Sequence, residues 1–304
     1  MEYTDTAGPG PVVVLLHGLL SAAAMYGPVV ADLRRDHRCV LPELPLGAHR
    51  IPTRPGADPT VGGLARLIEH FLAHLDLHDV VLVGDPRGLA PAVAAYHPAR
   101  LDRLVLAGHE AFDAAGKAGH LLGGGVVGGP SDGDGVLGGG LVTDALVTAA
   151  ACLPAGISII AALQRRRPPM AQAWGLAAAG IPPPVAEQNP DDQRRRRHIR
   201  RGIRRDLTGH LRSADQRARG RMRSAVAVGL AGFDKPTLIV WGLEREGRLR
   251  QQHQRLAGLL PQPELIHLGD PTTRTSDIAS AIREFARPRP AHDRLRGSQD
   301  SGSV

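Results

Sequence analysis

Residues 84–88, Gly-Asp-Pro-Arg-Gly, have the spacing of a turn that carries a catalytic nucleophile, but a proline stands where the nucleophile belongs. An apolar run over Val80–Val83 precedes this turn and an alanine-rich segment follows it. In that strand–turn–helix order, a G-x-Nuc-x-G turn holds an attacking side chain at the end of a sheet. Pro86 has no attacking atom, and its ring holds φ near roughly −65°. The pattern therefore predicts the turn without its chemistry.

Two local structures fit the same five residues. Asp85, Pro86 and Gly88 match positions i, i+1 and i+3 of a type I turn. Asp85 also matches a helix N-cap, with Pro86 as the first helical residue. In both cases the segment serves as a plain connection between a strand and a helix, which is the interpretation that we favour.

Other motifs offer replacement chemistry. Asp85 is a carboxylate, and carboxylates form covalent intermediates, although it stands one residue before the nucleophile position. Residues 129–133 match G-x-S-x-G around Ser131, but they lie in a glycine-rich region without a strand before them or a helix after them. Residues 132–135 resemble part of a calcium loop, yet they supply too few oxygen ligands and no closing glutamate. The sequence predicts no metal and no cofactor.

The first third of the chain alternates between apolar runs and helical periodicity. Short strands are predicted over residues 11–16, 38–41, 80–83 and 103–107, and helices over 22–33 and from the turn to about residue 97. A further helix starts at Thr60 as N-cap and has one apolar face, formed by Leu64, Leu67, Ile68, Phe71, Leu72 and Leu75. Pro91 is expected to kink the helix that follows the turn. Continuous apolar strands separated by helices predict a mostly parallel sheet with helices on both faces.

The pattern breaks after residue 113 and resumes near residue 233. Residues 116–140 contain 12 glycines in 25 positions, which predicts a loop or linker. A helix is predicted over 141–163, and an arginine-rich segment follows it. Strands at 236–241 and 264–268, a helix near 249–260 and a last helix that aligns Ile278, Ile282 and Phe285 complete the pattern. We divide the chain into a first core part (1–113), a linker and helical cap (114–232), a second core part (233–287) and a disordered tail (288–304).

Charge and cysteine content limit the possible partners and compartments. The net charge is +7, but residues 165–223 hold 16 arginines and five acids, so the rest of the chain is slightly acidic. Trp174 is the only aromatic residue in that segment, which disfavours nucleic-acid binding, although the cluster at 194–205 keeps it as a lesser alternative. Cys39 and Cys152 have no metal-like spacing and form no disulfide framework, so a cytoplasmic location is expected. No signal peptide or membrane span is evident.

Four segments together resemble the α/β-hydrolase superfamily. They are Val12–Gly18, with its Leu-Leu-His-Gly ending, Leu82–Gly84, Arg103–Leu106 and Pro236–Gly242. The resemblance covers nearly the whole chain, with the middle third as an inserted, arginine-rich helical cap. Within the superfamily, the sequence is most similar to the haloalkane dehalogenase and epoxide hydrolase branch, in which the turn that carries the nucleophile has the sequence Gly-Asn-Asp-x-Gly-Gly. Pro86 matches the attacking aspartate of that motif.

The resemblance also implies positions for the remaining roles. Leu19, after His17 and Gly18, matches the backbone N–H donor of the oxyanion or halide site, and Arg87 follows the elbow. We assign these four residues to the ligand pocket. The acid would come from Glu110 or Asp113, or from Glu244 or Glu246 beside Arg245.

The base histidine is absent from the final loop, residues 268–276, and His267 lies within the preceding strand. Our candidate catalytic set is Asp85, Glu110 and His267, with His17 as a second candidate for the base. We expect a weakly active or inactive hydrolase-fold protein that binds a small apolar molecule. The alternative is an active hydrolase of a small ester, epoxide or haloalkane that uses Asp85.

Overall fold

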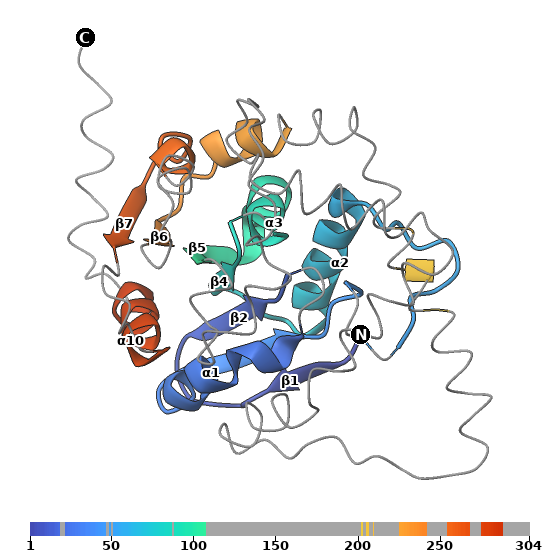
Figure 1. The fold of residues 1–304 in the computed structure, drawn as a ribbon, viewed down its shortest axis with the longest axis horizontal. Coiled ribbons are helices and arrows are strands. Elements are labelled where there is room, and N and C mark those ends of the chain that lie inside the picture. Colours follow the sequence, from blue (N-terminus) through green and yellow to red (C-terminus); the bar gives the residue numbers. More distant parts are fainter. Residues whose placement is uncertain are drawn as a thin grey trace, which may run out of the picture.

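The computed structural model describes residues 1–18, 22–46, 49, 51–86, 88–107, 202, 205–206, 209, 225–241, 254–267 and 275–287. Within them, seven strands form one sheet in the order β1-β3-β2-β4-β5-β6-β7 (Figure 1). Every neighbouring pair is parallel except β1 and β3, which are antiparallel. The predicted mostly parallel sheet is confirmed.

The strands are short, and the strands inside the sheet consist mainly of apolar residues. Their bounds are β1 Tyr3–Asp5, β2 Val12–Leu16, β3 Arg38–Pro42, β4 Val80–Gly84, β5 Leu101–Ala107, β6 Thr237–Trp241 and β7 Pro263–His267. β4 lies inside the sheet between β2 and β5, and all five of its residues are buried. A strand covered on both faces is apolar throughout, as this one is.

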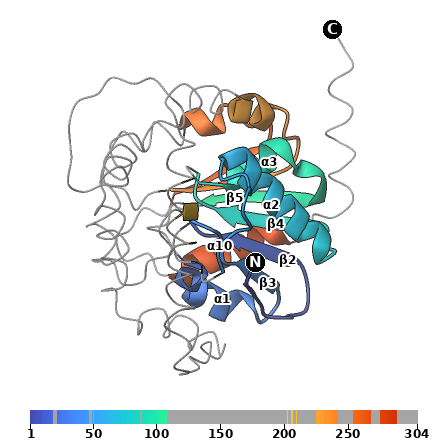
Figure 2. The same cartoon turned by 90° about the vertical axis from the view of Figure 1, so that its right-hand side faces the viewer.

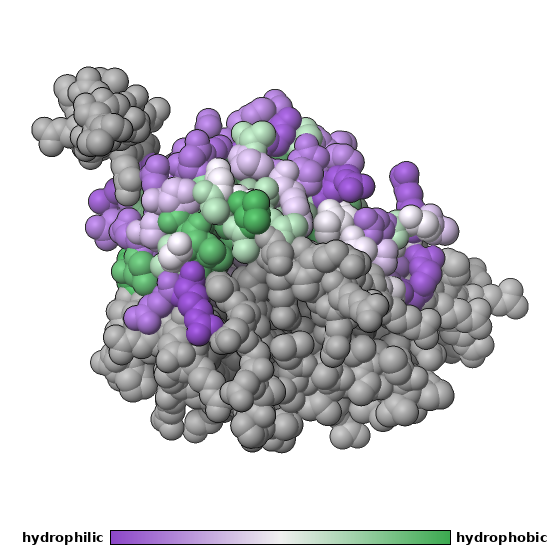
Figure 3. All heavy atoms as spheres, turned by 90° about the horizontal axis from the view of Figure 1, so that it is seen from above, coloured by the Kyte–Doolittle hydropathy of each residue, from purple (hydrophilic) through white to green (hydrophobic). Residues whose placement is uncertain are grey.

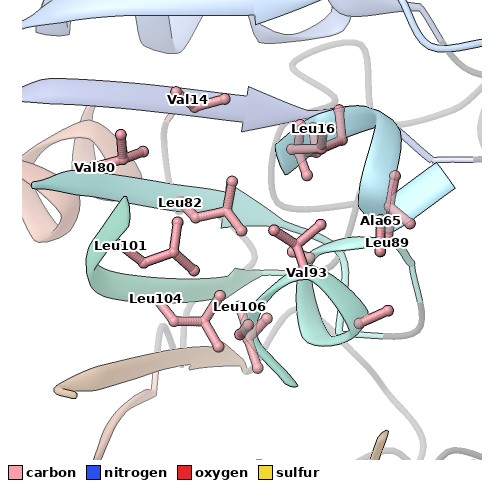
Figure 4. Close-up of a cluster of buried hydrophobic side chains, with 14 of the residues drawn as sticks. Val14, Leu16, Ala65, Val80, Leu82, Leu89, Val93, Leu101, Leu104 and Leu106 are labelled. Atoms are coloured by element: carbon pink, nitrogen blue, oxygen red, sulfur yellow. The ribbon is translucent and has the colours of Figure 1, made fainter. Parts of the chain in front are cut away.

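Helices cover both faces of the sheet. α2 (Val61–His74) and α3 (Ala90–Tyr96) lie on one face, and α1 (Gly27–Leu33) and α10 (Thr275–Ala286) on the other (Figures 1 and 2). Because successive side chains of a strand point to opposite faces, each strand contributes to two cores. In Figure 4, Val14, Leu82 and Leu104 lie in the core beneath α2 and α3, whereas Val13, Val81 and Val105 belong to the core beneath α1 and α10.

The predicted N-cap of α2 is confirmed. Thr60 has extended backbone geometry, and its hydroxyl oxygen accepts a hydrogen bond of 3.0 Å from the Gly63 amide. The apolar face that begins at Leu64 packs on the sheet, with Ile68 fully buried. The cap thus satisfies one of the amides that a helix start leaves without an intrahelical partner.

Replacement of Thr60 by alanine is expected to lower the free energy of unfolding by about 1 kcal/mol, because the Gly63 amide loses its acceptor. Urea denaturation measures the change. A Thr60→Ser variant, which keeps the hydroxyl, serves as the control and should retain most of the stability. Equal losses in both variants would contradict the capping role.

Several local expectations need correction. The elbow turn has the hydrogen bond of a β-turn, from the Gly88 amide to the Asp85 carbonyl at 2.9 Å, and the N-cap of α3 is Leu89. Asp85 is therefore not the helix N-cap. The kink expected at Pro91 was also wrong, because α3 begins at Ala90 and places this proline in its first turn, where no intrahelical amide donor is needed.

Two elements were missed, and the bounds of β2, β3, β4, β5, β6 and β7 differ from the predicted ones by one or two residues. β1 was not predicted because it is a three-residue edge strand with an exposed tyrosine and two polar residues. Residues 225–231 form a helix that the sequence pattern did not predict. β7 begins at Pro263, one residue before the predicted start. The predicted glycine-rich loop (116–140), the helix over 141–163 and the tail from 288 lie outside the described residues, and the domain boundaries stay a prediction.

The surface of the described residues is mixed in polarity. Figure 3 looks at the molecule from above and shows mostly hydrophilic residues around one group of hydrophobic ones. Among the described residues, no helix is both long and apolar enough to cross a membrane.

Candidate functional site

The turn after β4 is built by a close approach of backbone and helix. A Cβ atom added to Gly84 would lie 2.8 Å from the Ala90 Cβ and 3.3 Å from the Leu16 carbonyl oxygen, so only glycine fits there without displacement. Asp85 follows half-buried and Pro86 is buried. The predicted order of strand, turn and helix is thus present between β4 and α3, with the Pro86 ring in the turn.

Asp85 lies near the end of the neighbouring strand β2. Its carboxylate is close enough to Tyr26 to add to the effect of burial, which is the larger cause, in raising the pKa of this phenol above its usual range. The Tyr26 hydroxyl donates a 2.8 Å hydrogen bond to the carbonyl of Leu16, the last residue of β2. Asp85, Tyr26 and the end of β2 therefore meet at the carboxyl edge of the sheet, where ligands bind in open α/β sheets.

Both ring nitrogens of His17 contact the protein. The Leu44 amide donates a 2.8 Å hydrogen bond to Nε2, which makes Nε2 the acceptor and places the ring proton on Nδ1. Nδ1 then donates to the Gly18 carbonyl at 3.0 Å. The ring is buried and joins the end of β2 to the segment after β3, so it positions the loop that we predicted to form the ligand pocket.

Glu43 is a site residue that sequence reasoning missed. Its Oε1 atom lies 3.2 Å from His17 Nε2, and its Oε2 atom accepts a 3.3 Å hydrogen bond from the Ala23 amide. Oε1 is the one buried side-chain oxygen or nitrogen, among the residues described, that has no hydrogen-bond partner. A single acid after a strand carried no signal, because acids are common where strands end.

A second buried pair, His49 and Asp206, was also missed. The imidazole Nε2 lies 3.2 Å from Asp206 Oδ2, and the two side chains are 3% and 4% exposed. Asp206 belongs to the arginine-rich segment, whereas His49 lies in the segment that follows β3. No spacing rule connects residues 157 positions apart, so only tertiary structure could reveal them.

The other predicted site residues are only partly placed. Glu110, Leu19 and Arg87 lie outside the described residues, as do Ser131 and the other proposed acids. His267 is the last residue of β7, paired with Trp241 in the register of β6, and the structure describes its backbone alone. Its predicted role as a base, and that of Glu110 as an acid, stay predictions.

Within the described residues, the structure places neither an ionised thiol nor a group of metal ligands. Burial raises the pKa of the Cys39 thiol to about 12, so this side chain is protonated at neutral pH and acts as a packing residue. No group of three or more His, Cys, Asp or Glu side chains in the described ranges could hold a metal ion.

Comparison with sequences gives short matches. No protein-family model matches the chain. An uncharacterized protein of Mycobacterium tuberculosis is 33% identical over 102 residues, which are 33% of this chain and 29% of that protein. A haloalkane dehalogenase of Mesorhizobium japonicum is 30% identical over 103 residues, 33% of each chain. The matched segment thus spans about a third of the length of these relatives.

Comparison with solved structures covers nearly the whole chain. MenH from S. aureus is 18% identical with a TM-score of 0.52, over 93% of this chain and 97% of that one. A haloalkane dehalogenase loop variant from Bradyrhizobium elkanii is 16% identical with a TM-score of 0.55, over 93% of both chains. The enol-lactonase from Burkholderia xenovorans is 17% identical with a TM-score of 0.51, over 94% and 93%. At these identities the likeness concerns the fold.

Proposed function

We propose that this chain, which has the α/β-hydrolase fold, binds a small apolar molecule and does not form a covalent intermediate at its elbow. The observation that carries the proposal is Pro86, buried in the turn between β4 and α3. This position is the one that matches the attacking residue of haloalkane dehalogenases and epoxide hydrolases. A proline there supplies neither a nucleophilic oxygen nor a backbone proton.

The loss is large in energetic terms. In a serine hydrolase, removal of the nucleophile costs about 10⁶ in turnover, or about 8 kcal/mol of transition-state stabilisation. Binding and oxyanion contacts alone leave only a small part of the catalytic power. A hydrolase fold with Pro86 in place is therefore better suited to hold a ligand than to cleave one.

The residues around the elbow support an apolar ligand. Leu44 and Leu46 follow β3, and Pro86 and Leu89 follow β4; all four are buried apolar residues at the carboxyl edge. Small-molecule sites are lined mainly by such side chains with a few polar groups. His17 and Glu43, after β2 and β3, supply polar groups of this kind.

A second candidate function is hydrolysis of a small ester, epoxide or haloalkane by Asp85. The observation that favours it is the position of the Asp85 carboxylate near Tyr26 and the end of β2. On a haloalkane the carboxylate oxygen would displace halide and form an alkyl ester, and on an epoxide it would open the ring and form an ester that keeps the new alkoxide, which takes a proton. On an ester it would attack the acyl carbon, displace alkoxide and form an anhydride. Water then cleaves either intermediate and regenerates the carboxylate. Glu110 and His267 are the acid and base that we predicted for this route.

Turnover assays with the purified protein separate the two functions. The substrates are 4-nitrophenyl acetate, styrene oxide and 1-bromobutane, tested with wild type, Asp85→Ala and Ser131→Ala, with Asp102→Ala as a surface control. We expect no turnover above the rate in buffer and, for wild type, a rise in Tm with a non-reactive alkane or aromatic ligand. Turnover that is lost in Asp85→Ala and kept in Asp102→Ala would overturn the proposal and establish the second candidate.

A further inference from the structure

The Asp206 carboxylate accepts hydrogen bonds from three residues, His49, Thr53 and Arg205. Its Oδ2 atom accepts from the Thr53 amide at 2.7 Å and from His49 Nε2 at 3.2 Å. Its Oδ1 atom accepts from the Thr53 hydroxyl at 2.6 Å and from Arg205 at 3.0 Å. Four donors on one buried carboxylate are a specific arrangement, because an unpaired charge would be costly at this depth.

The backbone at Gly202 and Gly209 also lies against the loop that leads to α2. A Cβ atom added to Gly202 would lie 2.3 Å from the Pro52 Cβ, and one added to Gly209 would lie 3.3 Å from the Pro59 Cγ. The Arg205 guanidinium donates to the Thr53 carbonyl. Asp206 is thus the polar centre of a contact in which Gly202, Arg205, Asp206 and Gly209 lie against His49, Pro52, Thr53 and Pro59.

We propose that the contact of Asp206 with His49 and Thr53 is an acid-sensitive latch, which holds the backbone at Gly202, Asp206 and Gly209 against the loop after β3 at neutral pH and releases it on acidification. The latch stands on geometry independent of the elbow, so it does not rest on the proposed function. Its site is the carboxyl edge of the sheet, since residues 49–59 connect β3 to α2.

The direction of the pH dependence follows from the two partners. Burial, the largest cause, holds the pKa of His49 below its usual value near 6.5, so the docked state favours the neutral ring. On release the ring regains its usual pKa and takes up a proton below about pH 6.5. Docking is therefore complete above that pH and weakens as the pH falls below it.

Asp206 adds a second, more acidic step. Burial is the largest single cause and opposes ionisation, but the hydrogen bonds from Thr53, Arg205 and His49 together outweigh it and hold the pKa of Asp206 below its usual value of 3.8. A carboxyl group of lowered pKa stabilises docking above that value, and this part is lost as the pH falls through the lowered pKa. Near pH 5.5, only the His49 step is expected to act.

The charged and titratable groups around the latch are consistent with this order. His49 faces Asp206, Glu43 and His17, of which the two acids favour its protonation and His17 opposes it. Arg205 faces Asp206 and supports its ionised form. Burial of His49, together with the effect of His17, outweighs the effect of the two acids on the pKa of His49, so the docked ring is neutral.

Amide hydrogen exchange of the full-length protein tests the docking contact. Peptides that cover residues 202–209 and 49–59 are followed in wild type and in Asp206→Asn, which keeps the shape but replaces one acceptor oxygen by an NH₂ group. We expect protection in both segments to fall by roughly tenfold or more. Asp102→Asn is the matched control, since Asp102 is a half-exposed carboxylate paired with Arg103, and it should leave both segments unchanged.

A second pair of measurements tests the acid sensitivity. Protection of the same two segments in wild type is compared at about pH 7.5 and about pH 5.5, after correction for intrinsic exchange. It should fall by up to roughly tenfold at the lower pH. His49→Gln keeps a side-chain donor for Asp206 but cannot titrate, so its protection should stay constant over the same range. Thr53→Val, which removes only the hydroxyl donor, should weaken docking at both pH values.

Three outcomes of these measurements bear on the latch. Protection that is the same in wild type, Asp206→Asn and Thr53→Val would overturn the latch. If Asp206→Asn fails to fold, Thr53→Val and His49→Gln still test it at full length. An equal acid response in wild type and His49→Gln would overturn the part assigned to His49.

Discussion

Replacement of Leu82 by alanine is expected to lower the free energy of unfolding by about 3 kcal/mol. Leu82 is fully buried in β4, inside the sheet, and packs in the core beneath α2 and α3 (Figure 4). Large-to-small changes at such positions cost about 2–5 kcal/mol, because the lost transfer free energy adds to that of an unfilled cavity. Urea denaturation with an unchanged m-value measures the loss.

Leu265→Ala is the matched control for this prediction. The Leu265→Ala substitution removes the same atoms from a strand, but β7 lies at the edge of the sheet and Leu265 is 42% exposed. Its loss should stay below about 1 kcal/mol. Similar losses at the two leucines would contradict the central position of β4 beneath the elbow.

Two adjacent glycines at the start of α2 should respond to alanine with opposite signs. A Cβ atom at Gly63 would lie 2.4 Å from both the carbonyl oxygen and the Cγ atom of Asp58, so backbone and side chain must both move. We expect Gly63→Ala to lower the free energy of unfolding by about 1–3 kcal/mol. A Cβ atom at Gly62 meets only the Thr60 hydroxyl oxygen, at 3.8 Å.

Gly62→Ala is therefore expected to raise the free energy of unfolding by up to about 1 kcal/mol, since alanine restricts the unfolded chain and favours the helix. Thermal and urea unfolding of the two variants, measured side by side, check the difference in sign. Destabilisation of equal size in both would show that the loop around Asp58 does not pack on α2 as described.

Much of the fold was predictable because it depends on local patterns. The apolar runs at 11–16 and 80–83 predicted buried parallel strands, and the 3.6-residue period after Thr60 predicted α2 with its N-cap. The Asp-Pro-Arg-Gly sequence predicted the turn of the elbow. Each of these features depends on residues within one or two helical turns of each other.

Errors arose where neighbouring elements decided the structure. Pro91 was expected to kink a helix, but the turn at Asp85–Gly88 uses residues that the helix would have needed, so α3 starts later and accommodates the proline. β1 forms because its backbone pairs with β3 and the Asp5 carboxylate accepts from Arg38, which anchors a short polar strand. Neither partner is visible from the strand's own sequence.

The sequence by itself determined the class of fold and the absence of a nucleophile at position 86, because hydrophobic periodicity and residue type are local properties of the chain. Only the tertiary structure decided which polar groups share the carboxyl edge of the sheet. His17 meets Glu43 across two strands, and His49 meets Asp206 from 157 residues away. Such pairs are set by how the elements pack, since burial and hydrogen-bond geometry depend on distances in space that spacing along the chain does not encode.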